Sequence, residues 1–378
     1  MWIGCSRYLF VLTLAWASGV AQDQDAVGAV DLDTPFSLDK LAAQLETKRV
    51  VFVGETHDRY DNHLNQLEII RRLHQLDPNL AIGVEYFQQP YQANVDDYIA
   101  GRTTEQEFLR ATGYYQNWGY DYRLYAPIFR FAREQHIPVR ALNVPSALPS
   151  EVAKVGVAGL SEQQRTYLPK EIGPADAGYR GRLREAFEAH PSTKPDAFNH
   201  FVEAQLMWDE GMAQSAAAYL TANPDRRMVI LAGSGHLVFG SGIPQRLERR
   251  THVTYAIVLN NGETEPRIAD YILLSKKQEL PAAGILGVSL EEKSGECRIR
   301  SVSPGGAGEK AGLKREDVVL AINSQKVTTV ADTRLALWDK KPGNRVTIRV
   351  QRKHRFGGVT DRNFEIELGA PAQPSTRS

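Results

Sequence analysis

Two Gly-x-x-His elements carry the side chains of this 378-residue chain that are best suited to chemistry. The first contains Glu55 and His57, and the second contains His236. Imidazole exchanges protons near neutral pH and is a common metal ligand, so two such histidines suit either acid–base or metal chemistry. Each element follows a short apolar run, residues 50–53 or residues 228–232, of the kind that forms a buried strand.

The runs that precede these elements favour a parallel sheet. Apolar, β-branched runs without alternation are typical of strands that helices cover on both faces. Two more such runs end at Glu85 and at Asn143. In parallel sheets, ligands bind at the carboxyl ends of the strands. We therefore expect His57, Glu85 and His236 to meet in one cleft at that edge, with Asn143 at the same edge.

Two imidazoles and one carboxylate leave two kinds of chemistry open. His57, Glu85 and His236 could bind a divalent metal ion and leave positions free for water or substrate. Such an ion lowers the pKa of bound water to ~7, and Glu55 is then the candidate general base. Haem is the other option, with tyrosines or histidines as axial ligands of the iron.

A tyrosine-rich segment supplies the candidates for haem binding. Eight of the fifteen tyrosines fall between Tyr86 and Tyr125, and Trp118 and Tyr120 lie in the same segment. Aromatic side chains line pockets for flat apolar ligands, and a tyrosine can ligate haem iron. With Asn143, these four residues form the predicted cofactor-binding set, and the lack of a Cys-x-x-Cys-His motif predicts noncovalent binding. The segment is an insertion suited to a lid or to a homodimer interface.

Strand-like and helical patterns alternate over residues 22–275, which predicts an α/β domain with a mainly parallel sheet flanked by helices. A long helix from about residue 196 to residue 220 places Asp209 on its buried face. A buried carboxylate needs a partner, so Asp209 is either a structural tether or a hydrogen-bond partner of the cleft, and the structural role is favoured. Residues 276–284 are typical of a linker.

Residues 1–21 have the basic, apolar and small-residue regions of a signal peptide, which predicts export and cleavage after Ala21. A retained anchor is the alternative, although the apolar run is shorter than the ~20 residues that span a bilayer. Acidic and basic residues number 45 each, so no net charge attracts nucleic acid. Cys297 is the only cysteine after the leader, so no internal disulfide is expected and the thiol is assigned no role.

The C-terminal segment resembles a PDZ domain of the kind associated with bacterial proteases. The resemblance rests on residues 285–290, 297–307 and 311–323 and on the turn Lys341-Pro342-Gly343. It implies a small β-barrel-like sandwich with helices over residues 285–370. Residues 371–378 are expected to form a disordered tail. The resemblance also implies binding of C-terminal or extended peptides, whose carboxylate would be received by Leu286, Gly287 and Val288. A role as a spacer is the alternative.

The first domain resembles the ChaN-type haem-binding family of the Tiki superfamily. The resemblance rests on five motifs in order: Gly54-Glu55-Thr56-His57, Gly83-Val84-Glu85, Tyr125-Ala126-Pro127, Ala141-Leu142-Asn143-Val144-Pro145 and Ala232-Gly233-Ser234-Gly235-His236-Leu237. The family implies haem or iron uptake at the bacterial envelope, and its relatives include metal-dependent peptidases and erythromycin esterase-like hydrolases.

The expected function is therefore that of an exported haem- or iron-binding protein of the periplasm or envelope. Its expected partners are haem or an iron complex and, through the PDZ module, peptide or protein C-termini. The alternative is a metal-assisted or acid–base hydrolase that uses Glu55, His57, Glu85 and His236. A PDZ adaptor with a degenerate first domain is a third possibility.

Overall fold

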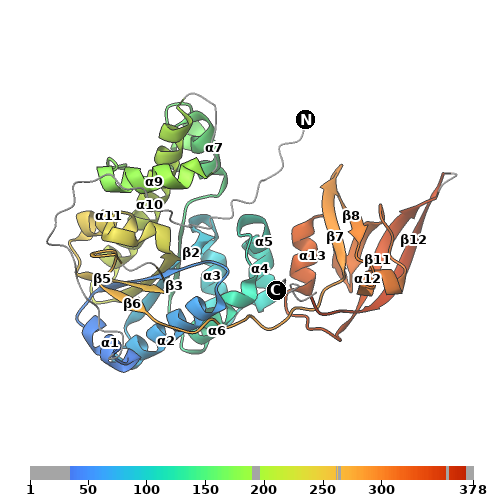
Figure 1. The fold of residues 1–378 in the computed structure, drawn as a ribbon, viewed down its shortest axis with the longest axis horizontal. Coiled ribbons are helices and arrows are strands. Elements are labelled where there is room, and N and C mark those ends of the chain that lie inside the picture. The colour runs from blue at the N-terminus through green and yellow to red at the C-terminus, as the bar shows by residue number, and fades with distance from the viewer. Residues whose placement is uncertain (1–34, 190–195, 261, 263–264, 355–356, 372–378) are drawn as a thin grey trace, which may run out of the picture. The chain divides into compact units, whose positions relative to one another are not determined.

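The computed structural model describes residues 35–189, 196–260, 262, 265–354 and 357–371. The predicted leader and all but the first residue of the predicted tail lie outside these ranges. Contacts divide the chain into two units, drawn together in Figure 1. The first unit holds most of the chain up to Gln278, and the second holds the chain from Glu279 together with Gly113–Gln116 and Tyr120–Tyr125.

The first unit is built on a parallel sheet of six strands in the order β3-β2-β4-β1-β5-β6. The strands are β1 (Val50–Glu55), β2 (Leu80–Gln88), β3 (Val139–Asn143), β4 (Arg227–Gly233), β5 (Tyr255–Asn260) and β6 (Tyr271–Leu273). Every residue of β1 and β2 is buried, because helices cover both faces of the sheet. The predicted fold class is confirmed.

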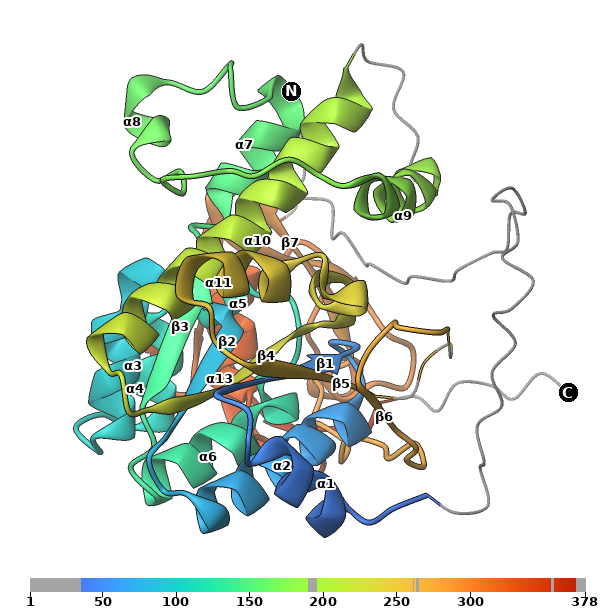
Figure 2. The same cartoon turned by 90° about the vertical axis from the view of Figure 1, so that its left-hand side faces the viewer.

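Helices pack on both faces of this sheet, as Figure 2 shows. One face carries α1 (Leu38–Leu45), α2 (Tyr60–Leu76) and α6 (Ala126–Glu134), and the other carries α10 (Ala197–Ala222) and α11 (Ile243–Thr251). The remaining helices are α3 (Gln92–Ile99), α4 (Glu105–Ala111), α5 (Tyr114–Asn117), α7 (Ala147–Val155), α8 (Glu162–Arg165) and α9 (Ala177–Glu188). The core joins Met212 of α10 and Leu247 of α11 to Phe52 and Ile230 of the sheet.

Strand β2 contains an irregularity that bears on the site. Val84 pairs with Ala141 of β3, whereas Gln88 pairs with Asn143, so β2 has more residues than β3 between these two pairs. Extra residues bend a strand and re-aim its side chains. Glu85 lies in this stretch, inside β2, which continues to Gln88 instead of ending before Glu85 as the apolar run indicates.

The second unit contains an antiparallel sheet in the order β12-β11-β9-β8-β7, with β10 paired to β9. Its elements are β7 (Val288–Lys293), β8 (Glu296–Val302), α12 (Ala307–Ala311), β9 (Val318–Ile322), β10 (Gln325–Lys326), α13 (Val330–Leu337), β11 (Arg345–Lys353) and β12 (Val359–Glu367). A core of its own includes Ile299, Ile322 and Ile348, and α13 lies against β7.

The two units divide within the predicted linker, residues 276–284. Within the described ranges, no helix combines the length and apolar character needed to cross a membrane.

Candidate functional site

Three predicted site residues converge at the carboxyl edge of the parallel sheet. His57 follows β1, Glu85 lies in β2, and His236 ends the 3-10 turn Ser234–His236 after β4, which is the strand between β1 and β2. The Nε2 atom of His236 lies 3.5 Å from Oε1 of Glu85. A Cβ atom added at Gly233 would lie 2.9 Å from Cε1 of His57 and 3.6 Å from Oε2 of Glu85. The structure therefore brings His57, Glu85 and His236 around the end of β4.

His57 is held by a carboxylate at its Nδ1 atom. That atom lies 2.8 Å from Oε1 of Glu55, and Oε2 of Glu55 lies 3.0 Å from Nδ1 of His63. Gln66 also donates a hydrogen bond of 2.9 Å to Oε2 of Glu55, and Nε2 of His63 lies 3.2 Å from the backbone oxygen of His57. One buried carboxylate thus ties together two histidines and a glutamine, and we call these four residues the His57 arm.

His236 is held in the same manner by a different element. Its Nδ1 atom lies 2.6 Å from Oδ1 of Asp209 on α10, and the hydroxyl of Tyr179 on α9 donates a hydrogen bond of 2.7 Å to Oδ2 of Asp209. Asp209 is therefore a hydrogen-bond partner of the cleft, which corrects the preference for a purely structural tether. We call His236, Asp209 and Tyr179 the His236 arm.

Glu85 occupies the middle of the cluster. Its Oε2 atom accepts a hydrogen bond of 2.7 Å from the backbone N–H of Gly233. Burial by itself would raise the pKa of Glu85, but the charge and hydrogen bond of His236 outweigh burial and lower it. Burial by itself would lower the pKa of His236, but the charges of Glu85 and Asp209 outweigh burial and raise it well above the ordinary value. The cluster therefore favours a carboxylate beside an imidazolium.

The His57 arm has the same electrostatic character. Burial opposes the charged form of Glu55, yet the charge of His63 and the hydrogen bonds of His57 and His63 outweigh it and hold the pKa of Glu55 far below its usual range. Burial also opposes charge on His57, but the hydrogen bond with Glu55 and the charge of Glu85 raise the pKa of His57. Glu55 thus stays charged and fixes the Nδ1 side of His57.

Aromatic side chains line the His57 side of the cluster. The rings of Trp118 and His57 meet edge to face with centroids 5.0 Å apart, and Tyr86 lies 6.1 Å from Trp118. Tyr86 is buried, and burial together with the charges of Glu55 and Glu85 raises the pKa of its phenol well above the ordinary value. Tyr125 is buried and Tyr120 partly buried, and both belong to the second unit.

Several buried polar atoms of the first unit have no hydrogen-bond partner within the described residues, and two of them bear on the site. They are Oδ1 of Asn143, at the end of β3, and Nε1 of Trp208, whose ring lies 6.1 Å from that of His236. Buried polar atoms are nearly always paired, so an orphaned acceptor or donor indicates a place for water or a ligand. The cofactor-binding role of Asn143 stays a prediction. Trp208 adds a hydrogen-bond donor that was not predicted.

His63, Gln66 and Tyr179 were not among the predicted site residues. His63 lies six residues after His57 in the helix that follows the first Gly-x-x-His element, and this proximity was the available signal. Tyr179 is 30 residues from Asp209 in a different helix, and no pattern in the sequence links the two.

The predicted metal set stays a prediction. Within the described ranges, no group of three His, Cys, Asp or Glu side chains is arranged to hold a metal ion. The Nδ1 atoms of His57 and His236 both contact carboxylates, and Nε2 of His236 also lies 3.5 Å from Oε1 of Glu85. Hydrogen-bonded carboxylates of this kind orient histidines both in metal sites and in acid–base sites.

The predicted peptide-binding residues lie at the start of β7. Gly287 has a φ of +67°, and a Cβ atom there would lie 3.2 Å from Cα of Gly306 and 3.3 Å from the backbone nitrogen of Ala307. Leu286 and Val288 flank this glycine, and β7 is the last strand of its sheet. The geometry leaves one edge of β7 for an added strand, as the peptide-binding prediction requires.

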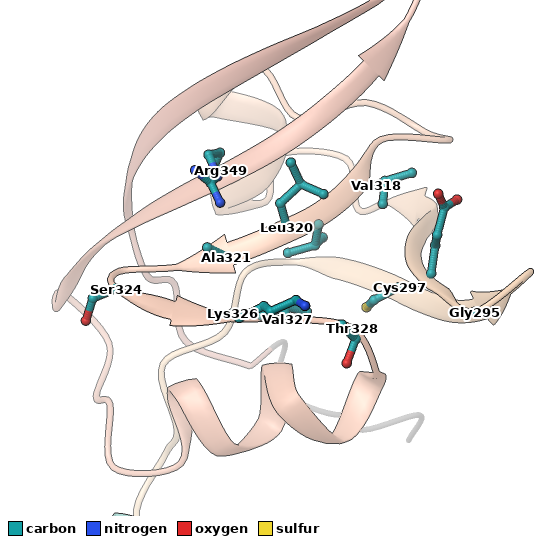
Figure 3. Close-up of a pocket in the computed structure, with 12 residues that line it drawn as sticks. Gly295, Cys297, Val318, Leu320, Ala321, Ser324, Lys326, Val327, Thr328 and Arg349 are labelled. Carbon is teal, nitrogen blue, oxygen red and sulfur yellow. The ribbon is translucent and has the colours of Figure 1, made fainter.

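A separate hollow of about 320 Å³ lies elsewhere on the same module (Figure 3). Its walls come from β8, β9, β10 and β11 and include Val318, Leu320, Lys326 and Arg349. It contains none of the predicted peptide-binding residues.

Comparison with known families agrees with this architecture. A family model described as "Haem-binding uptake, Tiki superfamily, ChaN" matches residues 41–247, more than half of the chain, and a PDZ-domain model matches residues 284–368. A solved structure described as "Cofacial heme binding to ChaN of Campylobacter jejuni" shares the fold, with a TM-score of 0.52 and 16% identity over 63% of this chain and 91% of that one.

Curated proteins of similar sequence come from a plant and from a bacterium. RETICULATA-RELATED 5, chloroplastic, of Arabidopsis thaliana is 25% identical over 264 residues, which cover 65% of this chain and 35% of that protein. Serine protease Do-like HtrB of Bacillus subtilis is 30% identical over 110 residues, which cover 25% of this chain and 24% of that protein. The chain thus spans about a third or less of the length of these relatives. The family match and the fold together show that the chain belongs to the ChaN-type haem-binding uptake family of the Tiki superfamily and carries a PDZ domain.

Proposed function

We propose that this protein is an exported haem- or iron-binding protein of the bacterial envelope whose PDZ domain binds C-terminal or extended peptides. The observation that carries the haem assignment is the contact of Trp118 with His57, because it sets a flat aromatic side chain beside a candidate iron ligand in a domain of the haem-binding family. Haem supplies an iron with axial positions for protein ligands and a flat apolar macrocycle.

The side chains around the cleft fit such a ligand when an imidazole loses its proton at Nε2 and binds the iron. The side chains of His57 and His236 are 18% and 14% exposed, so each is within reach of a ligand, whereas Tyr86 is buried and its phenol resists ionisation. Trp118 would flank the macrocycle, and the orphaned atoms of Asn143 and Trp208 would serve polar groups of the ligand.

Titration of the full chain with haemin, followed by absorbance, tests this function. We expect saturable binding that His57→Ala and Trp118→Ala each weaken by about tenfold or more, because each removes a direct contact. Tyr86→Phe is expected to leave binding unchanged, since its hydroxyl lies in the interior. An exposed residue provides the control variant, Tyr167→Phe. Absence of saturable binding by the wild type would rule out the haem function.

Export is a separate part of the proposal and rests on the pattern of residues 1–21. N-terminal sequencing of the protein recovered from the periplasmic fraction of a bacterial host should begin at Gln22. Recovery of full-length chain in the membrane fraction would favour the retained anchor.

Acid–base hydrolysis is the second candidate, and the pairing of each imidazole with a carboxylate favours it. In an ester cleavage, the imidazolium of His236 would donate a proton to the leaving group, and His57, once neutral, would take a proton from water at Nε2 while Glu55 holds Nδ1. The carboxylate of Glu85 would stabilise the positive charge on whichever imidazole carries the proton.

Hydrolysis of p-nitrophenyl esters by the full chain tests this candidate. His57→Ala and Glu85→Gln should each lower kcat by roughly 10²–10⁴-fold, because general acid–base groups contribute on that order. A chelator distinguishes the two forms of the reaction, since it stops a metal-assisted hydrolase and spares one that uses protein groups alone. Full activity of both variants would exclude this site as the catalyst.

The PDZ assignment predicts that a peptide adds to the free edge of β7. Gly287→Val should abolish binding of a C-terminal peptide library, because the residue has positive φ and its side chain would strike Gly306 and Ala307. Gly305→Val is a matched control, since Gly305 also has positive φ but no atom lies within 4 Å of an added Cβ. Equal loss in both variants would point to strain instead of a blocked groove.

A further inference from the structure

Tyr179 reaches the cluster from a helix that contains none of the predicted site residues. It lies in the first turn of α9, where the side chain of Asp176 accepts a hydrogen bond of 2.8 Å from the backbone N–H of Tyr179. The side chain is only 4% exposed. The hydrogen bond to Asp176 therefore holds the backbone of Tyr179, and burial holds its ring.

The hydroxyl of Tyr179 completes the hydrogen bonding of a carboxylate that is 1% exposed. One oxygen of Asp209 accepts from Tyr179, and the other contacts Nδ1 of His236. A Cβ atom added at Gly242 would lie 3.1 Å from Oδ2 of Asp209, so the backbone closes in behind the carboxylate. A carboxylate with both oxygens engaged cannot rotate without breaking a hydrogen bond in a buried site, which is costly.

The phenol ring is also held from outside the cluster. The guanidinium of Arg246 lies 5.0 Å from the ring centroid of Tyr179, and its Nε atom lies 3.3 Å from Oε1 of Glu210, the residue after Asp209 on α10. Burial, with the charge of Asp209, raises the pKa of Tyr179 well above its ordinary value. The hydroxyl of Tyr179 therefore stays protonated and remains a hydrogen-bond donor over the physiological pH range.

We propose that Tyr179 is a positioning residue, whose hydroxyl orients Asp209 so that the carboxylate fixes the imidazole of His236 with Nε2 toward Glu85. Helix α9 is thereby coupled to the orientation of a ligand-binding imidazole. The proposal deepens the proposed function of the cleft and rests on it for the functional consequence, whereas the orientation of His236 can be measured without any ligand.

The test compares Tyr179→Phe with Tyr219→Phe in the full chain. Tyr219 is half-buried on α10, the helix that carries Asp209, and its hydroxyl is outside the His236 arm. Selective ¹⁵N labelling of histidine gives the ring signals, and loss of one signal set in His236→Gln assigns His236. We expect the Nδ1–H signal of His236 to move upfield or be lost to exchange in Tyr179→Phe and to stay unchanged in Tyr219→Phe.

The functional readout is ester turnover or haemin binding, whichever the wild type shows. Loss of one hydrogen bond to a charged group should lower kcat, with KM unchanged, or haemin affinity by roughly tenfold. If Tyr179→Phe fails to fold, 3-fluorotyrosine at position 179 keeps the hydroxyl as a stronger donor to Asp209, which withdraws charge from the carboxylate and should move the His236 signal upfield.

An unchanged His236 signal in the altered protein overturns the proposal, as does an equal change in Tyr219→Phe. A wild type without haem binding or turnover contradicts the proposed function, and the His236 signal then still decides whether Tyr179 positions the imidazole.

Discussion

The two histidine arms present their imidazoles alike but are assembled differently. His57 and Glu55 are two residues apart, and the other members, His63 and Gln66, lie in the helix that follows directly, so the whole arm spans 12 residues from Glu55 to Gln66. The His236 arm joins residues 27 and 30 positions apart, from α9, α10 and the turn after β4. The first arm forms within one βα unit, and the second requires three packed elements.

The arms also differ in how their carboxylates are neutralised. Glu55 contacts two imidazoles and an amide, whereas Asp209 contacts one imidazole and a phenol. Removing one partner of a buried ion pair is costly because the other partner loses its compensating charge. The comparison therefore predicts that the carboxylate of the local arm contributes more to stability than that of the long-range arm.

The largest expected effect is on stability. Glu55→Gln removes the carboxylate that contacts both His57 and His63 and should lower the free energy of unfolding of the first domain by ~3–5 kcal/mol. Asp209→Asn removes a carboxylate from His236 alone, which keeps Glu85 at 3.5 Å, and should cost ~1–3 kcal/mol. Differential scanning calorimetry of the full chain measures both.

The control for this pair is Glu68→Gln, which removes a carboxylate that pairs with Arg71 and Arg72 at the surface. An exposed pair contributes little, so its cost should stay below ~1 kcal/mol. Equal losses of unfolding free energy in Glu55→Gln and Asp209→Asn would contradict the larger contribution of the carboxylate in the His57 arm.

The same distinction explains what the sequence could predict. The strands were evident because each is a continuous apolar run, and His57, Glu85 and His236 could be placed at one edge because carboxyl ends of parallel strands share an edge. Tyr179 could not be predicted, since its partner Asp209 is set by the packing of two helices. The extra residues of β2 near Glu85 leave no mark on hydrophobic periodicity and were missed for that reason.

The second prediction concerns Gly233, where His57 and Glu85 approach the backbone. Gly233→Ala would put a methyl group 2.9 Å from Cε1 and 3.1 Å from Nε2 of His57, closer than carbon atoms pack. Displacement of the ring should cost ~1–3 kcal/mol and weaken haemin binding or ester turnover by about tenfold or more. Calorimetry and the haemin titration measure the two effects.

Its control is Gly181→Ala, in the exposed part of α9, where no atom lies within 4 Å of the added methyl group. Alanine favours a helix over glycine, so this variant should gain ~0.5–1 kcal/mol. If Gly233→Ala behaves like Gly181→Ala, the close approach of His57 to β4 is not required.

The third prediction is a pH dependence to which both arms contribute. The lowered pKa values of Glu55 and Glu85 give stability that is present above the ordinary carboxyl pKa of ~4.3 and is lost as pH falls through the folded values. The raised pKa values of His57, His63 and His236 give stability that is present below the ordinary value of ~6.5 and is lost as pH rises through the folded values.

The unfolding temperature of the first domain should therefore be highest between about pH 4.3 and about pH 6.5 and should fall on both sides. Because the pKa of His236 is raised most, His236→Gln should flatten the alkaline side more than His57→Gln does. Calorimetric scans across pH measure this. An alkaline side that is identical in wild type and His236→Gln contradicts the ion pair between His236 and its two carboxylates.

The smallest expected effect separates the long-range arm from its supporting helix. Asp176 caps α9 through the backbone N–H of Tyr179, so Asp176→Ala should cost ~1 kcal/mol, while Asp176→Asn keeps the cap and should cost little. The buried ring of Tyr179 and its stacking under Arg246 do not depend on the cap, so the hydrogen bond to Asp209 should persist.

Ser37→Ala, which uncaps α1, is the matched control for a cap remote from α9. We expect similar small losses of stability in both alanine variants and an unchanged His236 ring signal. A shifted His236 signal in Asp176→Ala alone would show that the His236 arm depends on the N-terminus of α9, a dependence for which the local His57 arm has no counterpart.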